Sequence, residues 1–102
     1  MAQYRQGDLL IEKVNVSVNG KKVRKVTLAL GEVTGHSHVM VCDRDMEVNT
    51  EDAEVAERLI HTTATATITH QEHSTITVPP GTYRITRQRE WTDAEEPIRV
   101  AD

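Results

Sequence analysis

The sequence predicts a mainly β fold, a small antiparallel barrel or sandwich with one short helix. Apolar and polar residues alternate in almost every apolar segment, which is the pattern of strands with one buried face. Turn-forming residues interrupt these segments about every ten residues, as in β-sandwiches and barrels. The chain has 102 residues, enough for one domain and too few for two. We therefore expect residues 1–102 to form a single β domain.

The first predicted unit is a hairpin. A strand is expected to begin at Leu9 and to continue, in alternation, through residues 14–18. Asn19 and Gly20 follow, and this pair is the strongest two-residue hairpin signal because both positions tolerate positive φ. The second arm of the hairpin would cover residues 23–30.

The middle of the chain is expected to contain two strands and the helix. A strand over 36–41, a polar turn at 43–45 and a return strand at 46–48 come first. Residues 50–61 then predict a short helical insertion, in which Thr50 caps a first turn rich in acidic residues. The apolar residues of this segment fit one face of a helix.

The second half of the chain is strand-like almost throughout. Residues 63–70 alternate threonine with alanine or isoleucine, and 75–78 form another short apolar run. A rigid turn at 79–81 precedes the last long strand, over 82–90. Residues 98–100 are expected to add a final edge strand.

The expected core is thin. The chain is 37% hydrophobic, with no Phe, one Trp and two Tyr, so few large side chains are available to anchor it. A homo-oligomer or a bound metal would supplement such a core, and the strand over 82–91, with Tyr83 and Trp91, is the expected contact between subunits. The predicted core residues are the apolar members of the alternating runs: Leu9, Ile11, Val26, Leu28, Val39, Val41, Ile68, Ile76, Val78 and Ile85.

Charge and cysteine content exclude several classes of function. The formal net charge of −4 is too small to imply a nucleic-acid or membrane partner, and no apolar run approaches the roughly 20 residues that span a bilayer. Because Cys42 is the only cysteine, the chain can form neither an intramolecular disulfide nor a metal cluster held by several thiolates. No signal peptide is recognisable, and a cytoplasmic location is expected. Two clusters of basic residues are most simply solvated strand residues, and a nucleic-acid-binding surface is the less favoured interpretation. The clusters are Lys21, Lys22, Arg24 and Lys25, and then Arg84, Arg87 and Arg89.

Four histidines form the only concentrated chemistry of the sequence. His36 and His38 are two residues apart on a predicted strand, so both imidazoles share one face about 7 Å apart. His70 and His73 flank a turn at the end of another strand, and His70 has the inward parity. Imidazole is a common ligand of zinc, iron and nickel, so these four residues predict a divalent metal site, closed with four ligands or open with three and water. His61 has the outward parity and is expected at the surface.

Ligating imidazoles need acceptors on their second nitrogen, and Glu72, Glu47 and the Thr69 hydroxyl are the nearest candidates in sequence. We expect His38 and His70 to be the most deeply placed of the four histidines. The alternative is four histidines scattered on solvated faces. A zinc deaminase is excluded, because the motif that begins at His70 needs two closely spaced cysteines.

The first histidine pair resembles part of the first motif of the cupins. Gly31, His36, His38 and, nine residues later, Glu47 carry this resemblance, although the spacing to the glutamate is longer than in that motif. The second cupin motif is not matched, because no histidine follows Gly81 closely. The resemblance implies a cupin-like barrel with His36 and His38 as metal ligands and, more weakly, Glu47.

A second resemblance covers most of the chain, to a small family of uncharacterised bacterial and phage proteins. That family implies no function, and relative to its pattern the segment 49–62 looks like an insertion. The segments that carry the resemblance are Gly35 to His38, Thr69 to His73, Pro79 to Arg84, Gln88 to Trp91 and Val100 to Asp102.

The leading functional hypothesis is a small β-barrel protein that binds a divalent metal through the four histidines, in a structural or accessory role. The first alternative is a metal-free oligomeric interaction module of phage or mobile-element origin. The second is a cupin-like metalloenzyme with an open coordination position and with Glu72 or Glu47 as acid or base, which ranks last because no substrate pocket can be inferred from the sequence.

Overall fold

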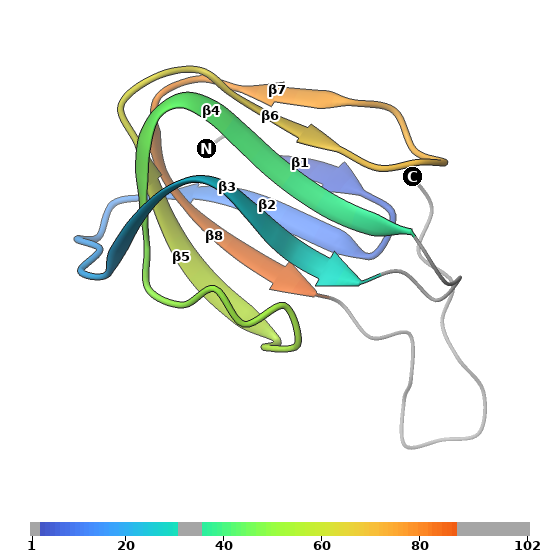
Figure 1. Ribbon diagram of the computed structural model, residues 1–102, viewed down its shortest axis with the longest axis horizontal. Coiled ribbons are helices and arrows are strands. Elements are labelled where there is room, and N and C mark those ends of the chain that lie inside the picture. Colours follow the sequence, from blue (N-terminus) through green and yellow to red (C-terminus); the bar gives the residue numbers. More distant parts are fainter. Residues whose placement is uncertain (1–2, 31–35, 88–102) are drawn as a thin grey trace.

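The protein is a single antiparallel sheet rolled into a nearly closed barrel (Figure 1). The computed structural model describes residues 3–30 and 36–87, and the following statements concern those residues. The strands are β1 (Gln3–Gln6), β2 (Leu9–Val14), β3 (Lys21–Leu30), β4 (Ser37–Val48), β5 (Glu57–Thr62), β6 (Ala66–Thr69), β7 (Ile76–Val78) and β8 (Gly81–Arg87). The prediction of a mainly β, antiparallel fold is confirmed. Within the described residues no helix is long and apolar enough to cross a membrane.

Strand β4 joins the two halves of the sheet. The strand order is β1-β2-β8-β5-β4-β6-β7, and β3 pairs with β4 outside this path. On one edge β4 pairs along its length with β3, whereas on the other edge it pairs first with β6 and then with β5. The strand therefore bends where its neighbour changes from β6 to β5, and the sheet curves with it (Figure 1).

The predicted helix over 50–61 is wrong, because this segment is a loop followed by β5. Thr50 Oγ1 and Asp52 Oδ1 accept hydrogen bonds from backbone amides two residues on, which favours turns over a helix. The buried Arg58 side chain also donates to the carbonyl oxygens of Thr50, Asp52 and Leu28. Strand β5 lies between β8 and β4, so its residues are an interior strand rather than an insertion on the surface.

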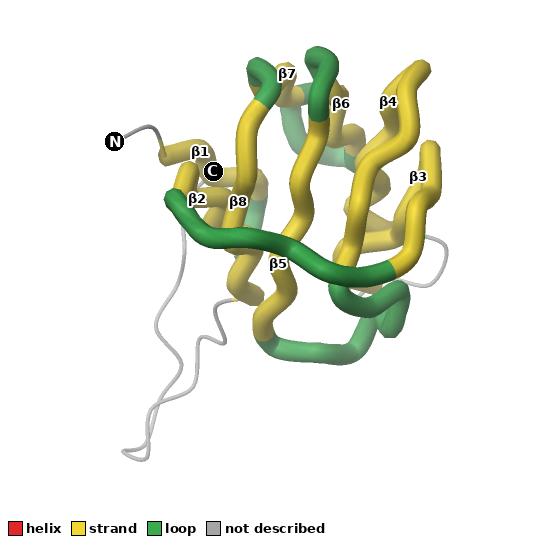
Figure 2. Tube along the Cα trace, turned by 90° about the vertical axis from the view of Figure 1, so that its left-hand side faces the viewer, coloured by secondary structure: helices red, strands yellow, loops and turns green. Residues whose placement is uncertain are grey.

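The predicted hairpin at Asn19 and Gly20 is also wrong. Strand β2 ends at Val14 and pairs with β1 and β8, whereas β3 pairs with β4, so residues 15–20 cross between two parts of the sheet (Figure 2). Gly20 is required for a different reason, since a Cβ atom there would lie 1.8 Å from the carbonyl oxygen of Val48. The glycine marks a close approach of two backbones, not a tight turn.

The polar triplet 43–45 lies within β4 and does not form the predicted turn. Its three side chains are exposed, and Arg24 on β3 pairs with Asp45 at 3.1 Å. One continuous strand therefore replaces the two shorter strands expected over 36–41 and 46–48.

Seven of the ten predicted core residues are buried: Leu9, Ile11, Val26, Leu28, Ile68, Val78 and Ile85. Val39, Val41 and Ile76 are only half-buried. On β4 the inward residues are His38, Met40 and Cys42, so Val39 and Val41 face the other side.

The expected subunit contact along 82–91 stays a prediction, and its described part is an interior strand of the sheet. Strand β8 is flanked by β2 and β5, so it has no free edge, and Tyr83 is fully buried with its hydroxyl donating to the Pro79 carbonyl oxygen at 2.5 Å. Trp91, Arg89 and the predicted strand over 98–100 lie outside the described residues.

Candidate functional site

The four predicted histidines lie beside the gap in the barrel, where β1 and the β6–β7 pair are not joined by backbone hydrogen bonds. The side chain of Gln6, at the end of β1, spans this gap. Its amide nitrogen donates to the carbonyl oxygens of Ile68 at 3.0 Å and Ser74 at 2.7 Å. Gln6 is 1% exposed, so these bonds form in a buried setting. We call the region around Gln6, Asp8 and the four histidines the seam.

The structure brings the four imidazoles together from two segments of the chain, the start of β4 and the connection between β6 and β7. The ring centroids of His38 and His70 are 4.3 Å apart, and those of His70 and His73 are 4.5 Å apart. His73 stacks on His38 with centroids 5.9 Å apart, and His36 meets His70 edge to face at 5.7 Å. His38, at 2% exposed, is buried, and the other three are half-buried, so His70 is less deep than its parity predicts.

Gln6 fixes the protonation of one nitrogen of His38. The Gln6 amide nitrogen is used by two carbonyl oxygens, so its Oε1 atom faces His38 Nδ1, 2.9 Å away. A carbonyl oxygen can only accept, so Nδ1 carries a proton. The remaining nitrogen of His38, Nε2, is then free either to bind a second proton or to bind a metal ion.

Asp8 supplies a carboxylate opposite that nitrogen. Its Oδ1 atom lies 3.4 Å from His38 Nε2, and its Oδ2 atom accepts from Arg87 Nε at 3.2 Å. The interaction with His38 lowers the pKa of Asp8 to about 2, assisted by Arg87 and opposed by burial. Asp8 is therefore ionised at neutral pH, and a cation between it and the Nε2 lone pair would be strongly stabilised.

His70 has its own pattern of contacts. The backbone N–H of Glu72 donates to His70 Nδ1 at 3.0 Å, so neutral His70 carries its proton on Nε2. Burial lowers the pKa of His70, and the neighbouring His38, His73 and His36 lower it further. His70 is thus held neutral by its surroundings, which is the form that a metal requires.

Gly7 makes room for the cluster. It lies in the β1–β2 turn with φ of +61°, where a residue with a side chain is strained. A Cβ atom there would lie 2.8 Å from His73 Nε2 and 3.3 Å from His38 Cε1. The turn therefore needs a glycine both for its conformation and for the space that the two imidazoles occupy.

Of the three residues expected to support the histidines, one lies beside them. Glu72 Oε1 is 3.8 Å from His36 Nδ1. Thr69 donates to the Val39 carbonyl oxygen instead of to an imidazole. Glu47 lies near the other end of β4, where it accepts from the Gly20 amide, so the cupin-like role suggested for it is not supported.

Sequence reasoning missed Asp8, Gln6 and Arg87. Asp8 lies in the turn between β1 and β2, and only the pairing of these two strands brings it to the seam. His61, expected to be exposed, is half-buried on the outer face of β5, where Nδ1 lies 2.8 Å from the Thr82 hydroxyl.

The donor spacing at the seam suits a tetrahedral metal ion. Two donors that are each about 2.1 Å from such an ion lie about 3.4 Å apart, and the centroids of two ligating imidazoles lie about 5 Å apart. His38 Nε2 and Asp8 Oδ1 are 3.4 Å apart, and the centroids of the four ring pairs in contact are 4.3 to 5.9 Å apart. Among the described residues, however, no three His, Cys, Asp or Glu side chains already converge on one point. Two donors are in place, and a third has to rotate toward them.

Comparison with known proteins places the chain in a family. No curated protein and no solved structure matches it. A family model described as a domain of unknown function, DUF8820, matches residues 5–88, and this range includes the four histidines, Gln6, Asp8 and Arg87. The chain belongs to the DUF8820 family.

Proposed function

We propose that this protein binds a divalent transition metal at the seam, with His38 and Asp8 as the two ligands already in position. The observation that carries the proposal is the distance of 3.4 Å between His38 Nε2 and Asp8 Oδ1, with His38 Nδ1 committed to Gln6. A lone pair on Nε2 facing a carboxylate oxygen is unfavourable unless a cation lies between them. A proton or a metal ion can fill that role.

The surrounding histidines favour the metal ion. A proton needs only the pair of His38 and Asp8, whereas a metal ion needs further donors, and the rings of His70 and His73 lie 4.3 and 5.9 Å from His38. Rotation of either ring would add a third ligand. We propose His73 as the third ligand, because its ring is stacked nearly parallel to that of His38 and its Nε2 atom faces the β1–β2 turn that carries Asp8. His36 and His70 are then candidates for the fourth position.

The metal would stabilise the barrel across its open side. His38 lies at the start of β4, Asp8 in the β1–β2 turn, and His73 between β6 and β7. One ion held by these three residues would join the β1–β2 turn to the paired strands β4, β6 and β7, across the gap that the Gln6 side chain spans. A mixed set of imidazole and carboxylate ligands suits zinc, iron or nickel. The proposed role is structural or accessory.

Metal titration with matched variants tests this proposal. Purified protein stripped with a chelator and titrated with zinc should bind about one equivalent per chain, and nickel should compete with zinc. Asp8→Asn and His73→Gln should each weaken zinc binding at least about tenfold, as expected when one ligand is removed. His61→Gln is the matched control, because His61 lies on the outer face of β5, and it should leave zinc affinity unchanged. Equal losses in His61→Gln and His73→Gln would contradict the proposal.

A further inference from the structure

A second polar site lies on the outer face of the barrel, apart from the seam. Three residues form one row across neighbouring strands: Glu47 on β4 is opposite His61 on β5, which is opposite Thr82 on β8. Directly opposed residues of antiparallel strands have Cβ atoms about 5 Å apart, so the three side chains are immediate neighbours. None of them contributes to the histidine cluster.

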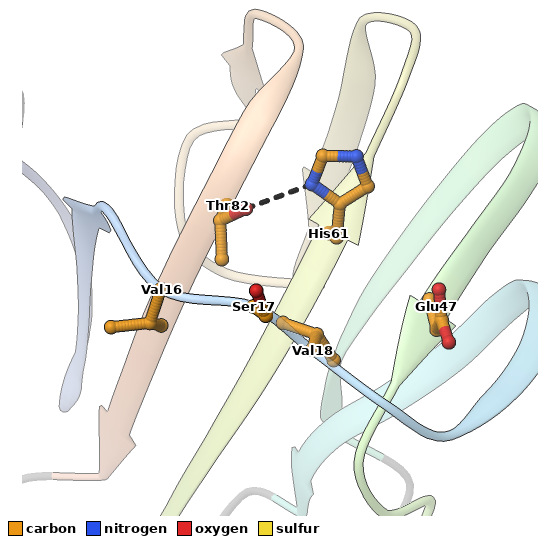
Figure 3. A pocket seen from close by; sticks show the side chains of 6 residues that line it. All are labelled: Val16, Ser17, Val18, Glu47, His61 and Thr82. Atoms are coloured by element: carbon orange, nitrogen blue, oxygen red, sulfur yellow. Dashed lines mark hydrogen bonds between the residues drawn. The ribbon is translucent and has the colours of Figure 1, made fainter.

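The connection between β2 and β3 turns this row into a groove. It crosses over β8 and β5 and holds Val16, Ser17 and Val18 above the sheet (Figure 3). These residues and the row enclose a hollow of about 270 Å³ that opens to solvent. Val16 is 46% exposed and gives the groove an apolar wall.

Hydrogen bonds leave one free acceptor on each of two side chains in the groove. His61 Nδ1 is 2.8 Å from the Thr82 hydroxyl, so when Nδ1 donates to that oxygen the lone pair of Nε2 is available. Glu47 Oε2 accepts from the Gly20 amide at 3.2 Å, which holds the carboxylate in place, and the second carboxylate oxygen is also an acceptor. The hydroxyl of Ser17 adds a third oxygen.

We propose that this groove binds a small aliphatic amine. A protonated amine carries three N–H donors and no acceptor, and the groove offers a carboxylate oxygen, an imidazole nitrogen and hydroxyl oxygens, all of which accept. The methyl groups of Val16 and Val18 provide an apolar surface for a short alkyl chain. The small volume fits about ten non-hydrogen atoms and excludes larger ligands. Lys22, exposed on β3 opposite Glu47, competes for the same carboxylate.

Titration of the isotope-labelled full chain with butylamine tests this inference. At about pH 8 the amine is charged and most imidazoles are neutral. We expect saturable shifts of backbone amide signals in residues 16–18 and at Glu47, His61 and Thr82, and none with 1-butanol, which has the same alkyl chain without the charge. Absence of saturation up to about 50 mM, or equal shifts with 1-butanol, would overturn the proposal, because at least millimolar affinity is expected of such a site.

Variants identify the acceptors. Glu47→Gln removes the charge but keeps an oxygen for the Gly20 amide, and it should weaken butylamine binding at least about fivefold. Asp43→Asn, an exposed carboxylate on the same strand, is the control and should leave affinity unchanged. Lys22→Gln should tighten binding. A lysine side chain offers the same ammonium group, so Nα-acetyl-lysine methylamide forms a second arm: binding of butylamine alone assigns the groove to free amines, and binding of both extends it to lysine side chains. A Glu47→Gln variant that binds butylamine normally would refute the assignment.

Discussion

Nε2 of His38 lies 3.4 Å from Oδ1 of Asp8, and this pair links the start of β4 to the β1–β2 turn. The two residues are far apart in sequence but are held in place on both sides. Gln6 accepts from the other nitrogen of His38, and Arg87 donates to the other oxygen of Asp8. A buried imidazole between an amide and a carboxylate is therefore pre-organised to hold a cation.

Asp8 should make the stability of the metal-free protein depend on acid pH. Its pKa is lowered from 3.8 to about 2, so the folded state favours the ionised form. That contribution is fully present above the unfolded pKa and is lost as pH falls from about 4 through about 2. Because Asp8 is 30% exposed, we expect its ionisation to contribute no more than about 2 kcal/mol to the free energy of unfolding. Urea unfolding of the wild type and Asp8→Asn between these pH values measures it.

The matched control for this experiment is Asp43→Asn, which alters an exposed carboxylate of β4. This variant should keep the acid dependence of the wild type, whereas Asp8→Asn should lose part of it. An unchanged pH profile in Asp8→Asn would show that Asp8 is not stabilised as an anion by its surroundings.

His70 should titrate below its ordinary range in the metal-free protein. Burial and the positive charges that His38, His73 and His36 would acquire all disfavour its protonation and lower its pKa from 6.5. The unfolded state therefore binds a proton more readily than the folded state, so protonation of this residue costs no stability above pH 6.5 and destabilises the fold as pH falls below that value. Imidazole nitrogen NMR across this range, with the urea-unfolded chain as reference, gives the measurement. A folded His70 that titrates at or above the unfolded value would contradict the packing described here.

Gly7→Ala should destabilise the fold and also weaken zinc binding. Alanine at φ of +61° is strained, and its Cβ would lie 2.8 Å from His73 Nε2. We expect a loss of about 1–2 kcal/mol in the free energy of unfolding. Gly7→Asn separates the two effects, because asparagine tolerates positive φ but still carries a Cβ atom. It should be the more stable of the two variants, and both should bind zinc less tightly than the wild type.

Neighbouring residues of β4 should respond differently to truncation. Met40 is fully buried, whereas Val41 is half-buried on the opposite face. Met40→Ala should therefore lower the free energy of unfolding by about 2–4 kcal/mol, and Val41→Ala by less than about 1.5 kcal/mol. Chemical denaturation of the two variants compares them directly, and the reverse order of effects would mean that the faces of β4 are assigned wrongly.

Alternation in the sequence was enough to predict the fold class and most of the core. It failed on β4, where Val39 and Val41 were expected inside in place of Met40 and Cys42. Hydrophobicity alone favours the valines, but the strand places His38 in the interior, and period two then fixes the other residues on that face. The position of His38 therefore determines which residues of β4 face the interior.

The predicted helix and hairpin failed because local signals were overridden by distant contacts. The segment before β5 satisfies its carbonyl groups with the Arg58 guanidinium, which a sequence cannot show. Asn19-Gly20 resembles a hairpin turn, but Gly20 is needed for the close approach to the Val48 backbone. Tertiary contacts decide such segments, and propensity does not.

The histidines were predictable because spacing in sequence places them on common faces and at strand ends. Asp8 and Gln6 were not, since their role depends on which strands meet at the seam. Glu47 was misplaced for the same reason: it shares a strand with His38 but lies near the opposite end, beside His61.

Anomalous X-ray diffraction at the zinc absorption edge, from crystals grown with one equivalent of zinc, tests the central proposal most directly. The metal site at the seam predicts a single strong peak about 2.0–2.2 Å from both His38 Nε2 and an Asp8 carboxylate oxygen, with His73 or another histidine of the cluster as a further ligand. A map with no peak at the seam, or with zinc only at His61 or on surface carboxylates, would contradict it.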